Sequence, residues 1–373
     1  MLSRAGHERR RTGRKLRLTA ALVALLAFGL APGQAGGHTA AEIQQQSSDD
    51  LVRNVVLALH GGAGTITREA FPPEREALYK AVLREALEQG YKVLQDGGTS
   101  VEAVETTVML LEDSELFNAG KGAVFTTDAT NELDASIMDG RTLDSGAVTG
   151  VTHIKNPVAL ARDLLERSRH VMLAGYGAEL YAQHRGFDLV TQEYFFTQSR
   201  WQALLNAKGG NPTFNFGEEA AAQAGAQADI QVDEMGTVGA VALSDADDLA
   251  AATSTGGLTN KPVGRIGDSP YVAAGTYARN DTVAVSCTGT GELFIRQAVA
   301  HEVSAAMEWG HLRVDRAAQA ALDKTTEIGG PVTGGLIALD SNGNLSVPFN
   351  TNGMFRGWVT SDGEIVVKMF ADE

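Results

Sequence analysis

Threonines placed between glycines, where apolar strands begin or end, constrain the fold of this sequence most. The pattern occurs three times in the C-terminal half, in Gly236-Thr-Val-Gly239, Thr253-Ser-Thr-Gly-Gly257 and Thr288-Gly-Thr-Gly291. A strand end carries such a hydroxyl to the rim of a sheet, and the neighbouring glycine lets a ligand approach the backbone. Backbone N–H groups freed there can stabilise an oxyanion. The sequence therefore predicts a chemical site built on strand ends.

Short apolar runs separated by polar turns predict antiparallel strand pairs around this site. We expect three hairpins, over residues 237–254, 270–287 and 335–349. In the third, Asn342-Gly343 suits a primed two-residue turn. Hairpins interleaved with helices favour sheets covered by helices over a parallel doubly wound fold.

The N-terminal half predicts a buried strand followed by helices. Residues 55–59 form a continuous apolar run, and the helical spacing of apolar residues extends over 73–96. Thr99-Ser-Val-Glu102 is a capping box that begins the next helix. Further helices are expected over 157–168, 173–184 and 291–308.

A glycine-rich segment, residues 60–65, follows the first strand. It lacks the Lys-Ser/Thr ending of a phosphate-binding loop and does not match Gly-x-Gly-x-x-Gly. We interpret it as a tight connection, and His60 as a structural hydrogen-bonding residue rather than a catalyst or metal ligand. The eight histidines show no zinc-binding spacing, and no Gly-x-Ser-x-Gly nucleophile elbow occurs in the expected context.

Composition excludes several classes of protein. Cys287 is the single cysteine, so no internal disulfide or cysteine-based zinc site can form. The formal net charge of −15 argues against a nucleic-acid partner, which needs a basic surface.

The first 35 residues read as a secretory signal peptide. Basic residues are followed by an uncharged apolar run, Leu18–Leu30, and by small residues up to Gly36. A membrane anchor is the alternative, but so short a run spans a bilayer poorly. We expect a soluble protein without a membrane partner, periplasmic or secreted. Residues 206–235 are rich in small and polar residues and are expected to form a linker.

Four further segments accompany the threonine motifs in order: His60-Gly-Gly-Ala-Gly, Leu116-Phe-Asn-Ala-Gly-Lys-Gly, residues 132–140 and Gly264-Arg-Ile-Gly-Asp268. From about residue 54 to 360 the sequence resembles the isoaspartyl peptidase/L-asparaginase family of N-terminal-nucleophile hydrolases. The resemblance implies an α+β fold, a four-layer αββα sandwich. It also implies self-cleavage between Gly236 and Thr237 into an α chain (36–236) and a β chain (237–373) of one domain. Relatives assemble as a dimer of αβ heterodimers and need no organic cofactor.

The chemistry of Gly236-Thr237 fits this implication. The Thr237 hydroxyl can attack the Gly236 carbonyl, and glycine tolerates the strained backbone that the attack requires. Water then opens the ester, and Thr237 becomes N-terminal. Its α-amine, with an unperturbed pKa of about 7.7–8.0, can serve as its own general base.

The resemblance also assigns roles to other residues. Thr237 is the nucleophile, Thr255 tunes its hydroxyl, and Asn118 supports it. An arginine and an aspartate close in sequence suit the carboxylate and the ammonium of an amino acid. The remaining roles are the oxyanion hole (Thr288 and the N–H of Gly289), the α-carboxylate site (Arg265), the α-amine site (Asp268) and backbone contacts to substrate (Gly289, Gly291).

The loop over residues 111–121 resembles one that binds a sodium ion through backbone carbonyls. The implied ligands are Leu111, Glu112, Ser114, Phe117, Ala119 and Lys121.

The predicted function is hydrolysis of the side-chain amide of L-asparagine, of the β-linked bond of isoaspartyl dipeptides, or of both. Both substrates present the same aspartyl acyl group, so the acyl-binding residues cannot discriminate between them. A glycosylasparaginase is the nearest alternative, disfavoured because Gly rather than Asp precedes Thr237. An amino-acid binding protein that never processes itself is the other, disfavoured by the intact Gly-Thr pair and the three threonines.

Overall fold

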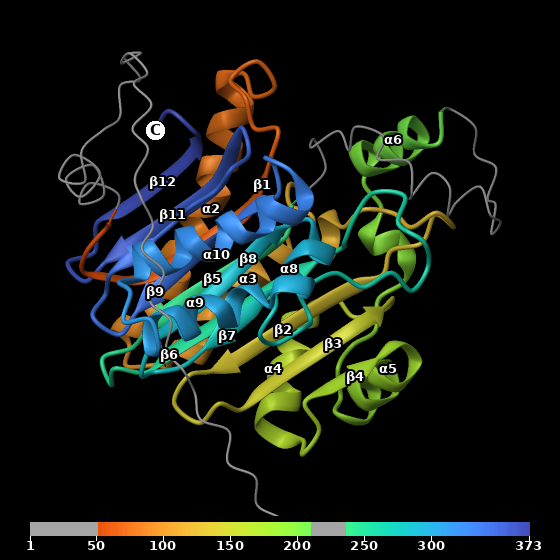
Figure 1. The fold of residues 1–373 in the computed structure, drawn as a ribbon. Coiled ribbons are helices and arrows are strands. Elements are labelled where there is room, and N and C mark those ends of the chain that lie inside the picture. Colours follow the sequence, from red (N-terminus) through yellow and green to blue (C-terminus); the bar gives the residue numbers. More distant parts are fainter. Residues whose placement is uncertain (1–50, 210–235) are drawn as a thin grey trace, which may run out of the picture. The chain divides into compact units, whose positions relative to one another are not determined.

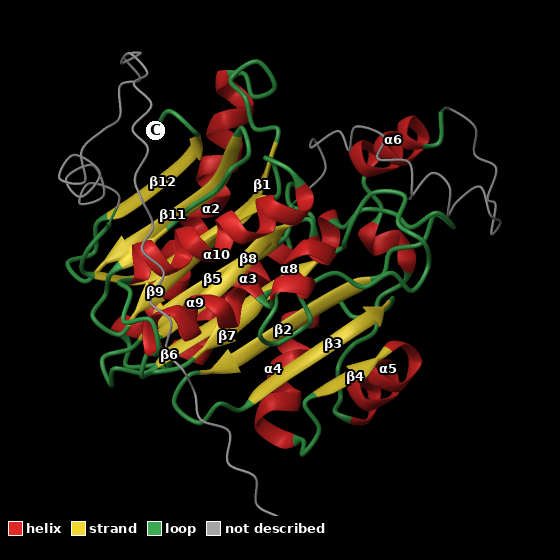
Figure 2. Ribbon diagram, viewed as in Figure 1, coloured by secondary structure: helices red, strands yellow, loops and turns green. Residues whose placement is uncertain are grey.

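The computed structural model describes residues 51–209 and 236–373 (Figure 1). The predicted signal peptide and residues 210–235 of the predicted linker lie outside the described residues. The described part is a mixed α+β fold with two sheets, as Figure 2 shows. Within it, no helix is both long enough and apolar enough to cross a membrane.

The larger sheet has eight strands in the order β12-β11-β1-β5-β6-β2-β3-β4. Every neighbouring pair in it is antiparallel except β3 and β4. Its strands are β1 (Val55–Gly64), β2 (Leu133–Asp139), β3 (Ser145–Val151), β4 (Met172–Ala174), β5 (Val238–Leu243), β6 (Leu249–Thr255), β11 (Gly353–Thr360) and β12 (Ile365–Phe370). Strand β5, which begins immediately after Thr237, lies in the middle of this sheet.

The smaller sheet has four antiparallel strands in the order β10-β9-β8-β7. They are β7 (Thr276–Ala278), β8 (Val283–Gly289), β9 (Gly334–Asp340) and β10 (Leu345–Ser346). The α-helices are α2 (Pro73–Gln95), α3 (Ser100–Glu112), α4 (Pro157–Arg167), α5 (Gly175–His184), α6 (Gln198–Ala207), α8 (Gly291–Gln297), α9 (Val299–Glu308) and α10 (Val314–Gly329). Two 3₁₀ turns, η1 (Gly120–Gly122) and η2 (Gln192–Phe195), complete the described elements.

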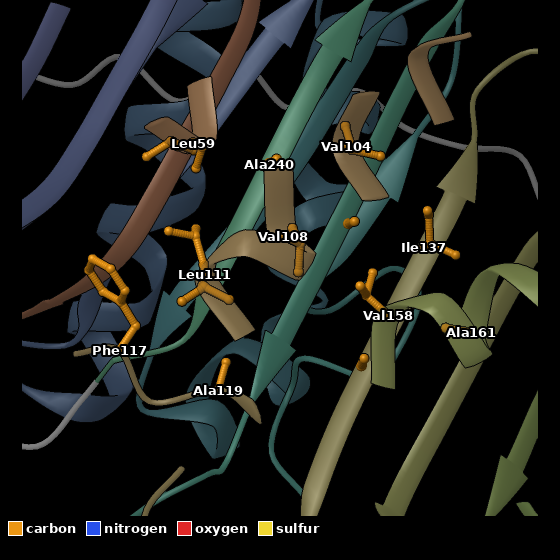
Figure 3. Packing of buried hydrophobic residues seen from close by; sticks show 14 of the residues in the cluster. Leu59, Val104, Val108, Leu111, Phe117, Ala119, Ile137, Val158, Ala161 and Ala240 are labelled. Carbon is orange, nitrogen blue, oxygen red and sulfur yellow. The ribbon is translucent and has the colours of Figure 1, made fainter. Parts of the chain in front are cut away.

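Three clusters of buried apolar side chains hold these elements together. The largest packs α2, α3 and α4 on one face of the large sheet; Figure 3 shows Ala240 of β5 next to Val108 of α3. A second joins strands of both sheets, and a third packs α8, α9 and α10 on the small sheet. Burial of this apolar surface is the main stabilising contribution to the fold.

Several local expectations are confirmed. The helix expected over 73–96 is α2, and the helix expected over 157–168 is α4. Thr99 forms the predicted capping box: its hydroxyl accepts from the N–H of Glu102, whose carboxylate accepts from the N–H of Thr99. The 237–254 hairpin is the antiparallel pair β5–β6.

The prediction of a loop at residues 60–65 is wrong. Strand β1 continues through Gly64 because β11 pairs with it as far as the Gly64–Gly353 pair. Residues 270–275 are not part of a strand but form turns, in which the amides of Tyr271 and Gly275 donate to the carbonyls of Asp268 and Tyr271.

Two further local predictions need correction. The helix expected over 291–308 breaks at Ala298, which has a φ of 48°. The break lets the first amides of α9, those of Ala300 and His301, donate to the carbonyls of Ala274 and Ala273. The 335–349 hairpin forms, but Gly343 is the residue of its turn with positive φ, so the turn is not the primed type expected.

Close packing of α4 on β3 predicts a stability difference between two glycine substitutions. A Cβ on Gly146 would lie 1.8 Å from the carbonyl oxygen of Ala161, whereas a Cβ on Gly177 of α5 meets no atom within 4 Å. We expect Gly146→Ala to reduce the free energy of unfolding by about 1–3 kcal/mol through overpacking. Gly177→Ala should raise it by about 0.5–1 kcal/mol through helix propensity. Urea denaturation of both variants checks this, and equal effects would contradict it.

Candidate active site

A narrow pocket collects residues predicted from separate sequence motifs. It lies where β6 and β8 end and the chain enters β5, and it is lined by Gly236, Thr237, Thr255, Arg265, Asp268 and Gly289, among others. Strand pairing explains the assembly, because Val238, the first residue of β5, pairs with Ser254 near the end of β6. Residues far apart in sequence thus meet at one edge.

The Thr237 hydroxyl is the chemically distinctive group of the pocket. The residue is 7% exposed, and its Oγ1 donates to Thr255 Oγ1 at 3.2 Å. Thr255 Oγ1 also accepts from the N–H of Gly257 at 3.0 Å. A buried hydroxyl held by a second hydroxyl has a fixed direction, as a nucleophile requires.

Asn118 acts on this arrangement through the loop that follows β6. Its Nδ2 donates to the carbonyl of Gly257 at 2.6 Å, its Oδ1 accepts from the N–H of Val124, and its carbonyl accepts from the N–H of Gly256. The side chain therefore fixes the loop whose N–H holds Thr255. Asn118 thus acts on the Thr237 hydroxyl indirectly, through Gly257 and Thr255.

Arg265 and Asp268 both line the pocket, but with different partners. Arg265 makes a bidentate pair with Glu292, at 2.9 and 2.8 Å. Asp268 is buried, and its Oδ2 has no hydrogen-bond partner among the described residues. Burial raises its pKa to about 7, against the opposing effect of Arg265. A buried carboxylate oxygen without a partner is suited to a ligand cation.

Gly291 lies against Asp268. A Cβ there would approach the backbone nitrogen and Oδ1 of Asp268 to 2.9 and 3.0 Å, so a larger residue would displace the carboxylate. Gly291 therefore protects the geometry of Asp268.

The proposed oxyanion residues lie at the end of β8. Thr288 is buried, and its Oγ1 accepts from the N–H of Ala63 in β1 at 3.3 Å, which leaves its own proton for another acceptor. Gly289 lines the pocket beside Thr237, and a Cβ on it would come within 2.3 Å of the carbonyl oxygen of Thr333.

The loop expected to bind sodium folds back on itself. A Cβ on Gly120 would lie 2.3 Å from the carbonyl oxygen of Glu112, and one on Gly122 would lie 2.1 Å from that of Phe117. The carbonyls of Leu111, Phe117 and Ala119 accept backbone hydrogen bonds. No cluster of three or more His, Cys, Asp or Glu side chains suited to a metal occurs in residues 51–209 and 236–373. The sodium site stays a prediction.

Two side chains near the site were not predicted to have their observed roles. The Glu112 carboxyl is fully buried, and its Oε1 accepts from the Val158 N–H and from Ser254 Oγ, next to Thr255. Burial raises its pKa to about 8. Ser286 Oγ lies 2.8 Å from His60 Nε2, an interaction for which the sequence carries no signal.

His60 has the hydrogen-bonding surroundings expected of a structural histidine. Its Nδ1 lies 3.0 Å from the carbonyl oxygen of Thr237, and the residue is inaccessible to solvent. Burial lowers its pKa to about 3, against the opposing hydrogen bond to Thr237, so the ring is neutral at physiological pH.

Comparison with known proteins identifies the family. Residues 53–368 match the asparaginase family model, so the chain belongs to that family. The isoaspartyl peptidase of Salmonella typhimurium is 48% identical over 308 residues, covering 82% of this chain and 96% of that protein. The isoaspartyl peptidase of Escherichia coli is 49% identical over 304 residues (81% and 92%). The plant-type L-asparaginase of Pyrococcus furiosus is 40% identical over 305 residues (80% and 94%). The resemblance found in the sequence is confirmed, and with it the prediction that the protein is a hydrolase.

The buried Glu112 carboxyl predicts a pH-dependent stability. With a folded pKa near 8, the native state holds a proton that the unfolded chain releases near its ordinary value of 4.5. Stability therefore falls as the pH rises from 5 to 8. Glu112→Gln keeps the acceptor oxygen but cannot ionise, so it should avoid about 3 kcal/mol of this loss, since one pKa unit corresponds to about 1.4 kcal/mol. Urea denaturation at pH 5 and pH 8 measures the difference.

Glu115→Gln, an exposed position three residues after Glu112, controls for the removal of one acidic residue. Parallel pH dependence in the wild type and Glu112→Gln would mean that Glu112 does not hold this proton.

Proposed function

We propose that the protein is a self-processing amidohydrolase with Thr237 as its nucleophile. The observation that carries the proposal is the buried Thr237 hydroxyl, oriented by Thr255 in a pocket that Gly236, Arg265 and Asp268 also line. In the precursor, Thr237 Oγ attacks the Gly236 carbonyl. The peptide bond between Gly236 and Thr237 breaks as an ester bond forms between Gly236 and Thr237 Oγ, and water then hydrolyses this ester. The chain from Thr237 then begins with a free amine.

The mature reaction repeats this chemistry on a substrate. Thr237 Oγ attacks the side-chain carbonyl carbon while its proton passes to the N-terminal amine. The leaving amine takes up that proton, and an aspartyl ester remains. Water, activated by the same amine, hydrolyses the ester and releases aspartate. The Thr288 hydroxyl and the Gly289 N–H are the proposed donors to the oxyanion of each tetrahedral intermediate.

The head group of the aspartyl moiety is recognised by two opposite charges. Arg265 binds the α-carboxylate as a planar fork, and the unpartnered oxygen of Asp268 accepts from the α-ammonium. In the free protein Glu292 occupies the Arg265 fork, so substrate binding shares or displaces that pair.

The substrates proposed are β-aspartyl dipeptides and L-asparagine. The similar proteins of Salmonella typhimurium and Escherichia coli are isoaspartyl peptidases, and that of Pyrococcus furiosus is an L-asparaginase. A second, larger cavity shares Gly236 with the pocket and is lined by the rings of Phe71, Tyr79, Phe117 and Phe355. Arg75, Glu115 and Arg200 also line it, so it offers room of mixed polarity for the second residue of a dipeptide on the leaving-group side.

The finer architecture is also a proposal. The three apolar clusters, one under α2–α4, one between the sheets and one under α8–α10, support a four-layer αββα sandwich. We further propose a dimer of αβ heterodimers, a sodium ion on the carbonyls of the 111–121 loop that rigidifies it near Asn118, and a periplasmic or secreted location. The basic and apolar N-terminal sequence supports the last of these.

Self-cleavage has a direct test. Intact mass and N-terminal sequencing of the wild type should give two chains, one of them covering residues 237–373. Thr237→Ser, which keeps a hydroxyl, should cut more slowly, and Thr237→Ala should remain one chain without activity. A wild type that stays uncut under conditions that let processing finish would refute the proposed function and favour a binding protein.

Head-group recognition predicts a defect confined to binding. Arg265→Ala should raise the KM for β-aspartyl dipeptides by about 100-fold, because a charge-assisted hydrogen bond contributes about 1.5–3 kcal/mol. Cleavage before Thr237 should be unaffected, since the peptide there carries no free α-carboxylate. Arg313→Ala, which removes a similar bidentate pair with Asp315 outside the pocket, is the control and should leave KM unchanged. An unchanged KM in Arg265→Ala would contradict the assignment.

A further inference from the structure

A row of polar residues crosses the middle of the large sheet next to the pocket. His60 of β1 pairs with Gly239 of β5, Gly239 with Thr253 of β6, and Thr253 with Ser136 of β2. These four residues therefore share one register line across four adjacent strands, which Figure 1 shows in this order. All but the glycine carry polar side chains, next to the apolar cluster that joins the two sheets.

The small sheet supplies a matching pair. Ser286 of β8 pairs with Thr276 of β7, and both are fully buried. Ser286 Oγ lies 2.8 Å from His60 Nε2 and 2.7 Å from Thr253 Oγ1. Thr276 Oγ1 donates to Thr253 Oγ1 at 2.6 Å and lies 2.8 Å from Ser136 Oγ. The side chains from the two sheets thus form one continuous polar row.

The two ends of the row lie at the pocket. At one end His60 Nδ1 meets the carbonyl oxygen of Thr237. At the other, Ser136 Oγ lies 2.6 Å from the carbonyl oxygen of Ser269, the residue after Asp268. The row therefore connects the main chain of Thr237 to the loop that carries Asp268, the proposed binding residue for the substrate α-ammonium.

The acceptor at the first end fixes the protons of His60 and Ser286. A carbonyl oxygen can only accept, so His60 carries its proton on Nδ1 and donates to Thr237. Nε2 is then an acceptor, and the Ser286 hydroxyl must donate its one proton to it. Thr253 Oγ1 can in turn donate to Ser286 Oγ at 2.7 Å or to the carbonyl of Gly275 at 3.2 Å. The hydroxyls lock the imidazole in one tautomer and one orientation.

Gly239 explains why the histidine fits. A Cβ there would lie 1.9 Å from Ser286 Oγ and 2.6 Å from His60 Nε2. The missing side chain leaves the space in which the ring and the hydroxyl meet. The glycine two residues after Thr237 in the sequence motif therefore belongs to the row rather than to a substrate contact.

We propose that His60 is a positioning residue that holds Thr237 by its carbonyl, and that Ser286 and Thr253 keep the imidazole in place. The β1–β5 pairing ends at His60 and Gly239, so it does not extend to Thr237, two residues earlier in the sequence. After self-cleavage the bond on the amine side of Thr237 is gone. The His60 contact then fixes the main chain of the new terminus, while Thr255 fixes its hydroxyl. This proposal rests on the proposed nucleophilic role of Thr237.

Variants of His60 and Ser286 test it in the full-length chain. His60→Ala removes the donor, His60→Asn keeps an amide N–H near the position of Nδ1, and Ser286→Ala removes the partner of Nε2. Self-cleavage is followed by intact mass, and kcat and KM are measured per amount of the 237–373 chain. Ser304→Ala is the matched control, because it removes a buried hydroxyl pair of similar length, 2.7 Å to Thr282, outside the row.

We expect His60→Ala to slow cleavage and to lower kcat by about 100-fold, the effect of a misplacement of about 1 Å. KM should change by less than about threefold, since Arg265 and Asp268 are intact. His60→Asn should recover about tenfold of the kcat, and Ser286→Ala should lie between the wild type and His60→Ala. Ser304→Ala should lower the melting temperature by about as much as Ser286→Ala does, but it should keep the wild-type kcat.

Two results would overturn the proposal while leaving the proposed function intact. One is that His60→Ala cleaves itself at the wild-type rate and has the wild-type kcat. The other is an equal fall in kcat in Ser286→Ala and Ser304→Ala, in proportion to their loss of melting temperature. The effect would then be one of general stability. If instead the wild type is not cut before Thr237, the proposed function itself fails, and the positioning role fails with it.

Discussion

The antiparallel pairing of β5 with β1 on one side and with β6 on the other is the constraint on which the rest of the structure depends. It places Thr237 at the head of a central strand, within reach of Thr255 at the end of β6 and of His60 in β1. The apolar cluster under α2–α4 buries the far face of the same strands, which holds their register. A one-residue slip would turn Gly239 and Thr253 to the helical face and dismantle the polar row.

The region around Thr237, the proposed nucleophile, concentrates polar groups that are costly to bury. Burying a polar group without a hydrogen bond costs free energy, so nearly all buried polar groups are paired within the protein. Oδ2 of Asp268 is an exception among the described residues, and Asp268 lines the pocket. The raised pKa of Asp268 and the neutral state of His60 have the same origin, since both groups are removed from water. A bound ammonium group would give Asp268 the positively charged hydrogen-bond partner that its Oδ2 lacks.

The sequence anticipated much of the local structure. Helix α2, the capping box at Thr99 and the β5–β6 hairpin follow from apolar spacing and short-range hydrogen bonds. It failed where distant pairing overrides local preference: the glycines after His60 continue as a strand because β11 pairs with them. Ala298 breaks a helical pattern because the first amides of α9 bond to the turn over residues 271–275. No window of the sequence contains both partners of such contacts.

The sequence by itself determined which groups are available for chemistry: a Gly-Thr bond, threonines beside glycines, and an arginine close to an aspartate. These depend on residue type and spacing. The tertiary structure alone decided which groups meet and in what environment, because those contacts join positions far apart in the chain. His60 and the Thr237 carbonyl are separated by 177 positions, and Ser254 and Glu112 by 142. Burial fixes their protonation, and burial is a property of the packed sheets rather than of any segment.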